Sequence, residues 1–327
     1  MSLESDKVKI SILITFCQQD RFIERTITSC LNSFKSSIFS YKIIVCLQSP
    51  SVQAIDTLEK IVKSSKSVSY IVNSPNENLI PLSKASLNRY MLLNQANSEY
   101  CLFLDGDDAY RINVDDGIKE LDNNKHLVGC GYAYSLYDWV LKAEKEVRSK
   151  YFDGQIVTLE TYRDYIHANC IVFRRQILLN AIIPIYCNDT TITRTLLHSG
   201  SIKYIDRYLM LYSVGIPSIY SGATVVEKRL SEFVINEESI KLFPEEGSFF
   251  LKKMRRLSKW NKGYTQDLDK CWEGHIRYRK LFFSKLFFKH LVAHSIFVKL
   301  SYILMLRACI QFFRLRAFMF SIGLRRR

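Results

Sequence analysis

An acidic cluster, Asp105-Gly106-Asp107-Asp108, directly follows the apolar run YCLFL. Carboxylate oxygens are preferred ligands of hard divalent cations, and Mg²⁺ typically takes one or two carboxylates together with substrate phosphates. A buried strand that ends in Asp-x-Asp places two carboxylates at the rim of its sheet. Three acids within four residues repel one another, so we expect a cation beside them. The cluster therefore predicts a Mg²⁺ or Mn²⁺ site with Asp105 and Asp107 as ligands.

Two other interpretations of the cluster stay open. Asp-x-Asp is common in solvated loops that carry no chemistry. It also occurs in phosphatases of the haloacid dehalogenase type, whose first Asp is a nucleophile. Those enzymes have the motif near the chain start and a Thr or Val two residues after the second Asp, where this chain has Ala109. Both differences count against a phosphatase.

The segments before the cluster alternate between two hydrophobic patterns. Short apolar runs predict buried strands over residues 9–16, 41–47, 68–72 and 100–104, and helical spacing predicts helices over residues 20–34, 55–62 and 82–96. Such alternation is typical of an α/β fold with a mostly parallel sheet and helices on both faces. Ligands in these folds bind at the carboxyl ends of the strands, where the acidic cluster and the turn Thr15-Phe16-Cys17 both lie.

The composition indicates a globular protein of a reducing compartment. The chain has 327 residues, of which 48% are hydrophobic, so it can bury a substantial core. Its nine cysteines form no CxxC pair, which argues against a disulfide framework and a zinc site. The N-terminus has the character of neither a signal nor a transit peptide, and no apolar run predicts a spanning helix. We therefore expect a cytoplasmic protein.

The basic residues are concentrated near the C-terminus. From Phe250 to Arg327 there are nineteen Lys and Arg against three acids, whereas the remainder is near neutral. We expect an α/β domain over residues 1–230 and a mainly helical, basic segment over residues 231–327. At about 100° per residue, five basic residues of that segment fall on one stripe of an otherwise apolar helix: Lys285, Lys289, Lys299, Arg307 and Arg314.

A cationic stripe on an apolar helix suits an anionic membrane surface. Packing of this segment on the α/β domain, or on a second copy in a homo-oligomer, is the alternative. The segment lacks a recognisable nucleic-acid module, so we do not expect nucleic acid as a partner.

Four segments of the first 215 residues together resemble family 2 glycosyltransferases of the GT-A fold. They correspond to the family's opening strand and turn, its second strand, its helix leading into the metal motif, and its Glu-Asp motif with the helix that follows. The segments are SILITFCQQDRFIERTITSCLNS (Ser11 to Ser33), KIIVCLQS (Lys42 to Ser49), NRYMLLNQANSEYCLFLDGDD (Asn88 to Asp108) and YCNDTTITRTLLHSGSIKYI (Tyr186 to Ile205).

The resemblance implies a role for each matching residue. Asp189 stands where the family places its catalytic base, since inverting transfer needs a carboxylate to take the proton of the acceptor hydroxyl. Asp105 and Asp107 would hold the ribose and the metal, and His167 and Asp108 are candidates for contact with the donor or acceptor. Leu47 and Asn188 depart from the family's acidic residues. The residues implied to bind the nucleotide-sugar are Thr15, Cys17, Gln48, Arg89, Asp105 and Gly106.

The combined hypothesis is an inverting, metal-dependent glycosyltransferase with a GT-A domain. It would move a sugar from a nucleotide-diphospho-sugar, with UDP favoured, to a glycan or lipid-linked acceptor in surface polysaccharide synthesis. We expect it to be peripheral on the inner face of the cell membrane. The rival from another class is a non-catalytic nucleotide-sugar binding or scaffold protein of the same fold.

Overall fold

The computed structural model describes residues 8–216, apart from residues 18, 75–80, 148, 163–165 and 183–186. The chain divides into two compact units, and the described residues belong almost entirely to the one formed by residues 1–75 and 85–221. The predicted basic helical segment and its boundary at residue 230 lie outside the described residues.

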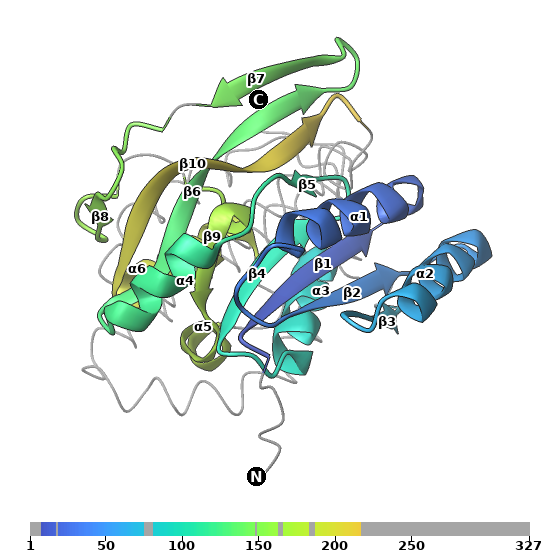
Figure 1. Ribbon diagram of the computed structural model, residues 1–327, viewed down its shortest axis with the longest axis horizontal. Coiled ribbons are helices and arrows are strands. Elements are labelled where there is room, and N and C mark those ends of the chain that lie inside the picture. Colours follow the sequence, from blue (N-terminus) through green and yellow to red (C-terminus); the bar gives the residue numbers. More distant parts are fainter. Residues whose placement is uncertain are drawn as a thin grey trace, which may run out of the picture. The chain divides into compact units, whose positions relative to one another are not determined.

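The first part of the sheet is parallel. Strands β1 (Ile10–Cys17), β2 (Tyr41–Gln48), β3 (Val68–Asn73) and β4 (Tyr100–Asp105) lie in the order β3-β2-β1-β4 (Figure 1). Every residue of β1 is buried, because this strand has a neighbour on each side and helices over both faces. All four predicted strands are thus confirmed to within one residue at each end.

Beyond β4 the sheet becomes mixed, which the prediction of a mostly parallel sheet did not include. The order continues through β9 (Ile171–Arg174), β6 (Leu127–Asp138), β10 (Ser201–Val214) and β5 (Ala109–Tyr110). Strand β9 is antiparallel to β4 and β6, whereas β6 and β10 are parallel with three register shifts. Two short additions, β7 (Ala143–Val147) and β8 (Ile156–Val157), pair with β6 and β10.

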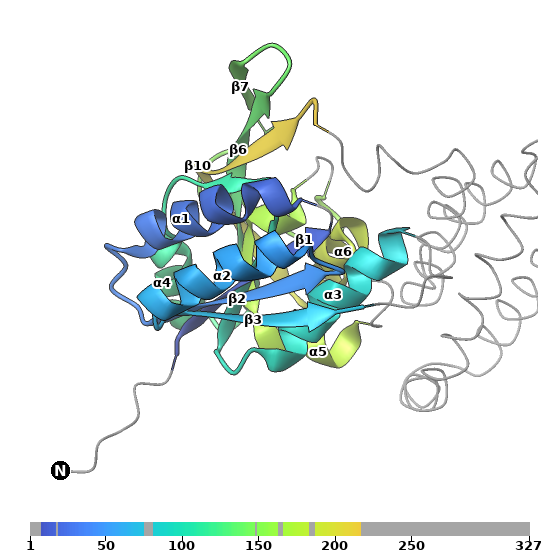
Figure 2. The ribbon, with the colours of Figure 1, turned by 90° about the vertical axis from the view of Figure 1, so that its right-hand side faces the viewer.

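Helices cover both faces of the sheet (Figure 2). On one face lie α1 (Ile23–Phe34), α2 (Val52–Ser64) and α4 (Asp115–Asn123), and on the other lie α3 (Pro81–Gln95), α5 (Arg175–Ala181) and α6 (Asp189–Ser199). Side chains of β1 alternate between these layers, so that Ile12 and Ile14 join the core under α1 while Leu13 joins the core under α3.

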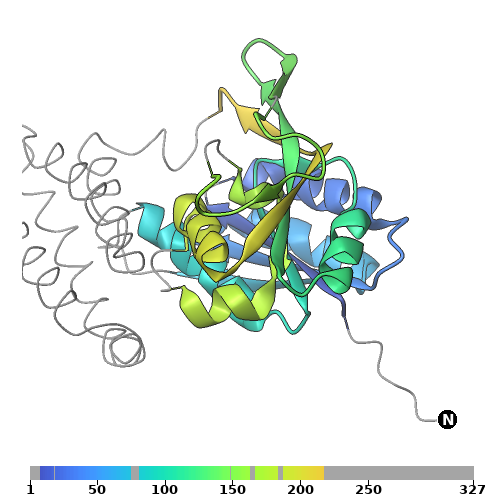
Figure 3. The same ribbon diagram turned by 90° about the vertical axis from the view of Figure 1, so that its left-hand side faces the viewer.

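The three predicted helices are confirmed, although α2 begins three residues before and ends two residues after the predicted range 55–62. A short 3₁₀ turn, η1 (Asp20–Phe22), precedes α1 where a continuous helix was expected. A second 3₁₀ turn, η2 (Ala168–Cys170), leads into β9. Figure 3 shows α5 and α6 on the side of the sheet opposite to α4. None of the helices in the described part of the chain is both long enough and apolar enough to span a membrane.

Candidate active site

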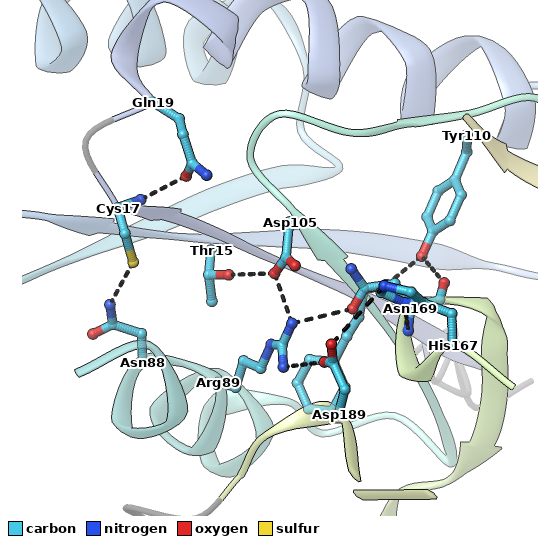
Figure 4. Close-up of polar contacts among 11 residues, drawn as sticks. Thr15, Cys17, Gln19, Asn88, Arg89, Asp105, Tyr110, His167, Asn169 and Asp189 are labelled. Carbon is cyan, nitrogen blue, oxygen red and sulfur yellow. Dashed lines mark hydrogen bonds and ion pairs between the residues drawn. The ribbon is translucent and has the colours of Figure 1, made fainter. Parts of the chain in front are cut away.

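The acidic cluster forms a tight loop at the carboxyl end of β4. Asp105 is the last residue of that strand and pairs in register with Thr15 of β1. The Gly106 amide donates to the Thr15 carbonyl at 2.8 Å, and the Thr15 hydroxyl donates to Oδ1 of Asp105 at 3.3 Å. Two of the predicted ligand-binding positions therefore meet at one edge of the sheet (Figure 4).

Position 106 must be glycine because there is no space for a side chain. A Cβ atom built at this position would lie 2.3 Å from Cδ1 of Phe16 and 2.8 Å from Cγ and Cε1 of the same ring. The Phe16 side chain is fully buried in the core under α1, so its ring cannot move aside easily. The loop packs this closely on β1 only because residue 106 has no side chain.

The carboxylate of Asp107 lies in an environment that disfavours its charge. Burial, and next the negative charge of Asp105, raise its pKa to about 6. A hydrogen bond from Gln19 and the charge of Arg25 lower the pKa and offset part of the effect. Asp105 and Asp107 thus present close negative charges at the sheet edge.

A divalent cation would relieve this repulsion, so the donor set fits Mg²⁺ or Mn²⁺. Within the described residues no group of three or more His, Cys, Asp and Glu side chains is arranged to hold a metal. A cation held by Asp105 and Asp107 would therefore need further oxygen ligands, of the kind that a diphosphate supplies.

Asp108 points into the protein. It is 1% exposed, and Oδ1 accepts a hydrogen bond from the Ser213 amide of β10 at 2.8 Å. Its Oδ2 atom has no hydrogen-bond partner among the described residues. Burial, with the charges of Asp107 and Asp105, raises the pKa of Asp108 well above its usual value. The structure does not bring this carboxylate to the edge occupied by Asp105, so the predicted contact of Asp108 with donor or acceptor gains no support.

A buried arginine joins the acidic loop to the predicted base. Arg89 of α3 donates from Nη2 to Oδ1 of Asp105 at 2.8 Å and from Nη1 to Oδ1 of Asp189 at 2.5 Å. Burial acts to lower its pKa, but the two carboxylates outweigh burial and hold the pKa well above the usual value. The partners lie 16 and 100 residues away along the chain, and one guanidinium holds them together (Figure 4).

Asp189 occupies the first position of α6. The preceding Asn188 caps this helix by accepting a hydrogen bond from the Thr191 amide at 3.2 Å. The Asp189 carboxylate is about one-third exposed, which leaves it accessible to a ligand. Asn188, which departs from the family's Glu, thus serves as the helix cap that places Asp189.

His167 lies beside the Asp189 carboxylate, with 3.9 Å between Nε2 and Oδ2. Its Nδ1 atom accepts a hydrogen bond from the Asn169 amide at 3.2 Å, so the proton of the neutral ring belongs on Nε2. Burial lowers the pKa of His167, although Asp189 and Asp105 act to raise it. The ring also packs against Tyr212 and Tyr134, with centroids 5.0 and 5.7 Å away. The imidazole thus places its Nε2 atom near the predicted base, at a distance longer than a hydrogen bond.

A chain of amide groups connects the ends of the first three strands. Asn88 of α3 donates from Nδ2 to Oε1 of Gln48 at 3.0 Å and to the Cys17 sulfur at 3.3 Å. Its Oδ1 atom accepts from Nδ2 of Asn73 at 2.6 Å. Burial raises the pKa of the Cys17 thiol to about 12, so this cysteine is neutral and is not a nucleophile. Cys17 and Gln48, two predicted nucleotide-binding residues, are brought together.

Sequence reasoning missed several residues of this edge. Asn73 and Asn88 were not among the candidates, although Asn73 directly follows a predicted strand and Asn88 directly precedes Arg89. Arg25 and Ser213 were also missed, because only the folded chain brings them to the acidic loop. Asn169, which the sequence had pointed to together with His167, accepts a hydrogen bond from Nη2 of Arg89 at 3.4 Å and belongs to the same network.

Comparison with known proteins gives a family and a fold. Residues 11–179 match the model of the family described as glycosyl transferase family 2. The crystal structure of S. aureus TarS 1-349 superposes with a TM-score of 0.53 at 15% identity, covering 85% of this chain and 74% of that one. The structure of TarS 1-349 in complex with UDP-GlcNAc gives a TM-score of 0.55 at 16% identity, covering 94% of this chain and 82% of that one.

The complex of TarS 1-349 with UDP gives a TM-score of 0.54 at 14% identity, covering 98% of this chain and 93% of that one. No curated protein sequence matches this chain. Identities this low establish a shared fold and leave substrate and reaction to be argued from the site.

Proposed function

The chain belongs to glycosyl transferase family 2, and from that premise we propose that it is an inverting glycosyltransferase that uses a nucleotide-diphospho-sugar. The family match and the TarS structures confirm the predicted GT-A fold class. The reaction, the donor, the cation and the acceptor are parts of the proposal.

One observation carries the proposal, namely the Arg89 bridge between Asp105 and Asp189. A transferase that inverts in one step needs its acceptor base on one side of the anomeric carbon and its diphosphate site on the other. The acidic loop supplies the candidate diphosphate site, and α6 supplies the candidate base. A single buried guanidinium fixes the spacing of the two.

In the proposed mechanism Asp189 accepts the proton of the acceptor hydroxyl while that oxygen attacks the anomeric carbon. The guanidinium of Arg89 orients the Asp189 carboxylate, and Nε2 of His167 lies 3.9 Å from the same carboxylate. Asp105 and Asp107 would hold a divalent cation, which would neutralise the negative charge that develops on the leaving diphosphate. Thr15 and Arg89 keep Asp105 oriented toward that site.

We favour a UDP-sugar as donor. TarS was crystallised with UDP-GlcNAc and with UDP. In this chain the amides of Gln48, Asn73 and Asn88 lie at the ends of β1 to β3 and could offer both donors and acceptors to a nucleobase. They would take the place of the acidic residue that Leu47 replaces.

The acceptor is proposed to be a glycan or a lipid-linked sugar of surface polysaccharide synthesis. Support comes from the predicted cationic stripe within residues 231–327, which would hold the enzyme on an anionic membrane. Flotation of the full chain with anionic liposomes tests this part, and removal of residues 287–327 should release the protein. Equal flotation of both forms would contradict membrane binding by this segment.

The donor proposal is tested by thermal denaturation of the protein with a panel of nucleotide-sugars, each with and without Mn²⁺. A ligand at one hundred times its Kd stabilises by about 2.7 kcal/mol, which raises the Tm by roughly 5 to 10 °C in a unit of this size. We expect UDP-sugars with Mn²⁺ to produce the largest shift, and Asp105→Ala to lose it. No shift with any nucleotide-sugar would overturn the proposal.

A turnover assay distinguishes an enzyme from the alternative, a non-catalytic nucleotide-sugar binding or scaffold protein. A binding or scaffold protein would show the thermal shift without release of UDP. For an enzyme, UDP release should be detectable and should fall in the Asp189→Asn variant, which keeps the size of the side chain and removes its basicity.

A further inference from the structure

Two consecutive residues of α1 bind the backbone of the acidic loop. The hydroxyl of Thr26 lies 2.8 Å from the Gly106 carbonyl and 2.9 Å from the Asp108 carbonyl, so its single proton is shared between them. Arg25 donates from Nη1 to the intervening Asp107 carbonyl at 2.9 Å. Helix α1 therefore contacts three successive carbonyl groups of the loop.

Ser213 of β10 completes this arrangement. Its hydroxyl donates to the Asp107 carbonyl at 2.5 Å, and its amide donates to Oδ1 of Asp108 at 2.8 Å. Arg25 Nη1 is also 3.4 Å from the Ser213 hydroxyl. The carbonyl of Asp107 thus has two donors from elements that lie 82 and 106 residues away along the chain.

The guanidinium of Arg25 is itself held in place. It lies over the ring of Trp139, 5.0 Å from the centroid, and over Phe22 at 5.9 Å. These rings pack on each other with centroids 5.3 Å apart. An arginine stacked in this way presents its N–H groups in a fixed direction.

Fixing the carbonyls of a tight loop also fixes its side chains. Each peptide unit is planar, so two carbonyls that are held on either side of a Cα atom together set the direction of its Cα–Cβ bond. The carbonyls of Gly106 and Asp107 flank the Cα of Asp107. Their hydrogen bonds to α1 and β10 therefore determine where the Asp107 carboxylate can point.

We propose that Arg25, Thr26 and Ser213 are positioning residues that orient the Asp107 carboxylate of the acidic loop for a divalent cation. The inference rests on the proposed function, since it assumes that Asp105 and Asp107 hold the cation of a nucleotide-sugar. The three residues act through the backbone and do not touch the cation. They pre-organise the ligands, so that cation binding does not have to order the loop.

The experiment measures Mn²⁺ binding to the full chain at saturating UDP, and UDP binding without metal, both by calorimetry. Thr26→Val keeps the side-chain shape and removes the hydroxyl, whereas Thr26→Ser retains the hydroxyl. Arg25→Met removes the guanidinium and keeps an apolar stem over Trp139. Ser98→Ala is the matched control, because Ser98 is a buried hydroxyl that donates to a backbone carbonyl, that of Tyr100 at 2.7 Å, at the opposite end of β4.

We expect the Mn²⁺ Kd to rise about tenfold in Thr26→Val and in Arg25→Met, as for the loss of one hydrogen bond in a preorganised site. Metal-free UDP binding should stay within about twofold in both, and Thr26→Ser should restore the Mn²⁺ affinity. Ser98→Ala should lower the Tm and leave the Mn²⁺ affinity unchanged, which separates positioning from stability. If Thr26→Val does not fold, Arg25→Met decides, because Arg25 is only half-buried.

Wild-type Mn²⁺ affinity in Thr26→Val or Arg25→Met would overturn the inference. A loss of Mn²⁺ affinity in Ser98→Ala as large as in these two variants would overturn it as well. If the wild-type protein binds UDP and Mn²⁺ while the variants behave like it, only the positioning role fails. If the wild-type protein binds neither UDP nor Mn²⁺, the proposed function is wrong, and the inference that rests on it is wrong as well.

Discussion

Replacement of Gly106 by alanine tests whether the acidic loop depends on its close contact with β1. The added Cβ would lie 2.3 Å from Cδ1 of Phe16, well inside van der Waals contact, and 2.8 Å from two other atoms of the ring. The ring is fully buried, so it cannot rotate into solvent. The loop must therefore move away from β1, or the ring must be forced into the core.

Overpacking of this kind destabilises proteins by about 1 to 3 kcal/mol. A loss of about 2 kcal/mol should lower the Tm by roughly 4 to 8 °C in a unit of this size. Activity should fall further than stability, because Asp105 and Asp107 flank the substituted residue. A displacement of about 1 Å at reacting groups lowers the rate on the order of a hundredfold.

A double variant makes the reasoning specific to Phe16. Phe16→Leu removes part of the ring that the new Cβ would meet, so Gly106→Ala should be less harmful when combined with it. We expect a coupling of at least about 1 kcal/mol in a double-mutant cycle followed by thermal denaturation. UDP release measured in the same four proteins should recover in parallel. Strict additivity in both assays, or a Gly106→Ala protein with wild-type Tm and rate, would refute the steric argument.

Three further outcomes are expected. Asp105→Ala and Asp107→Ala should each abolish Mn²⁺-dependent UDP binding, and unchanged affinity by calorimetry in both would remove the metal-site assignment. Asp189→Asn should reduce transfer by about 10² to 10⁴-fold while UDP–Mn²⁺ affinity stays near wild type; equal rates in the two proteins would disqualify Asp189 as the base. Burial lowers the pKa of His167, so this residue binds fewer protons in the folded protein than in the unfolded chain as the pH falls below about 6.5, and its contribution to stability declines over that range. Asp107, whose pKa is raised to about 6, acts in the opposite direction, so the test is the difference between wild type and His167→Gln. The Tm of His167→Gln should gain on that of wild type from pH 7.5 to 5.5, and a constant difference would show that His167 does not carry this pH dependence.

The local hydrophobic pattern of the sequence was sufficient to predict the strands and helices of the first half of the fold. The apolar runs that become β1 to β4 differ from the observed strands by no more than one residue at each end. Their alternation with helices placed the acidic cluster at the end of β4, and the match to a family pattern pointed to Arg89 and Asp189. The strands and helices are encoded by hydrophobic periodicity over windows of about five to fifteen residues, which a sequence displays directly. Arg89 and Asp189 were implied only by the resemblance to the family.

The second half of the sheet was harder to predict from the sequence. Strand β9 is four residues long and runs antiparallel between β4 and β6, while β10 follows β6 with three register shifts. Short strands and irregular register leave little periodic signal, and their direction is set by the neighbours with which they pair.

The sequence by itself determined the chemical character of the site, since it supplied carboxylates after a core strand, an arginine in the preceding helix and an aspartate at a later helix start. Only the tertiary structure decided which groups meet. It joined Asp105 and Asp189 through one guanidinium, turned Asp108 inward to Ser213, and set Arg25 against the loop backbone. The physical reason is that these contacts link residues up to 105 positions apart. They follow from how helices and strands pack on one another, and no local stretch of chain encodes that packing.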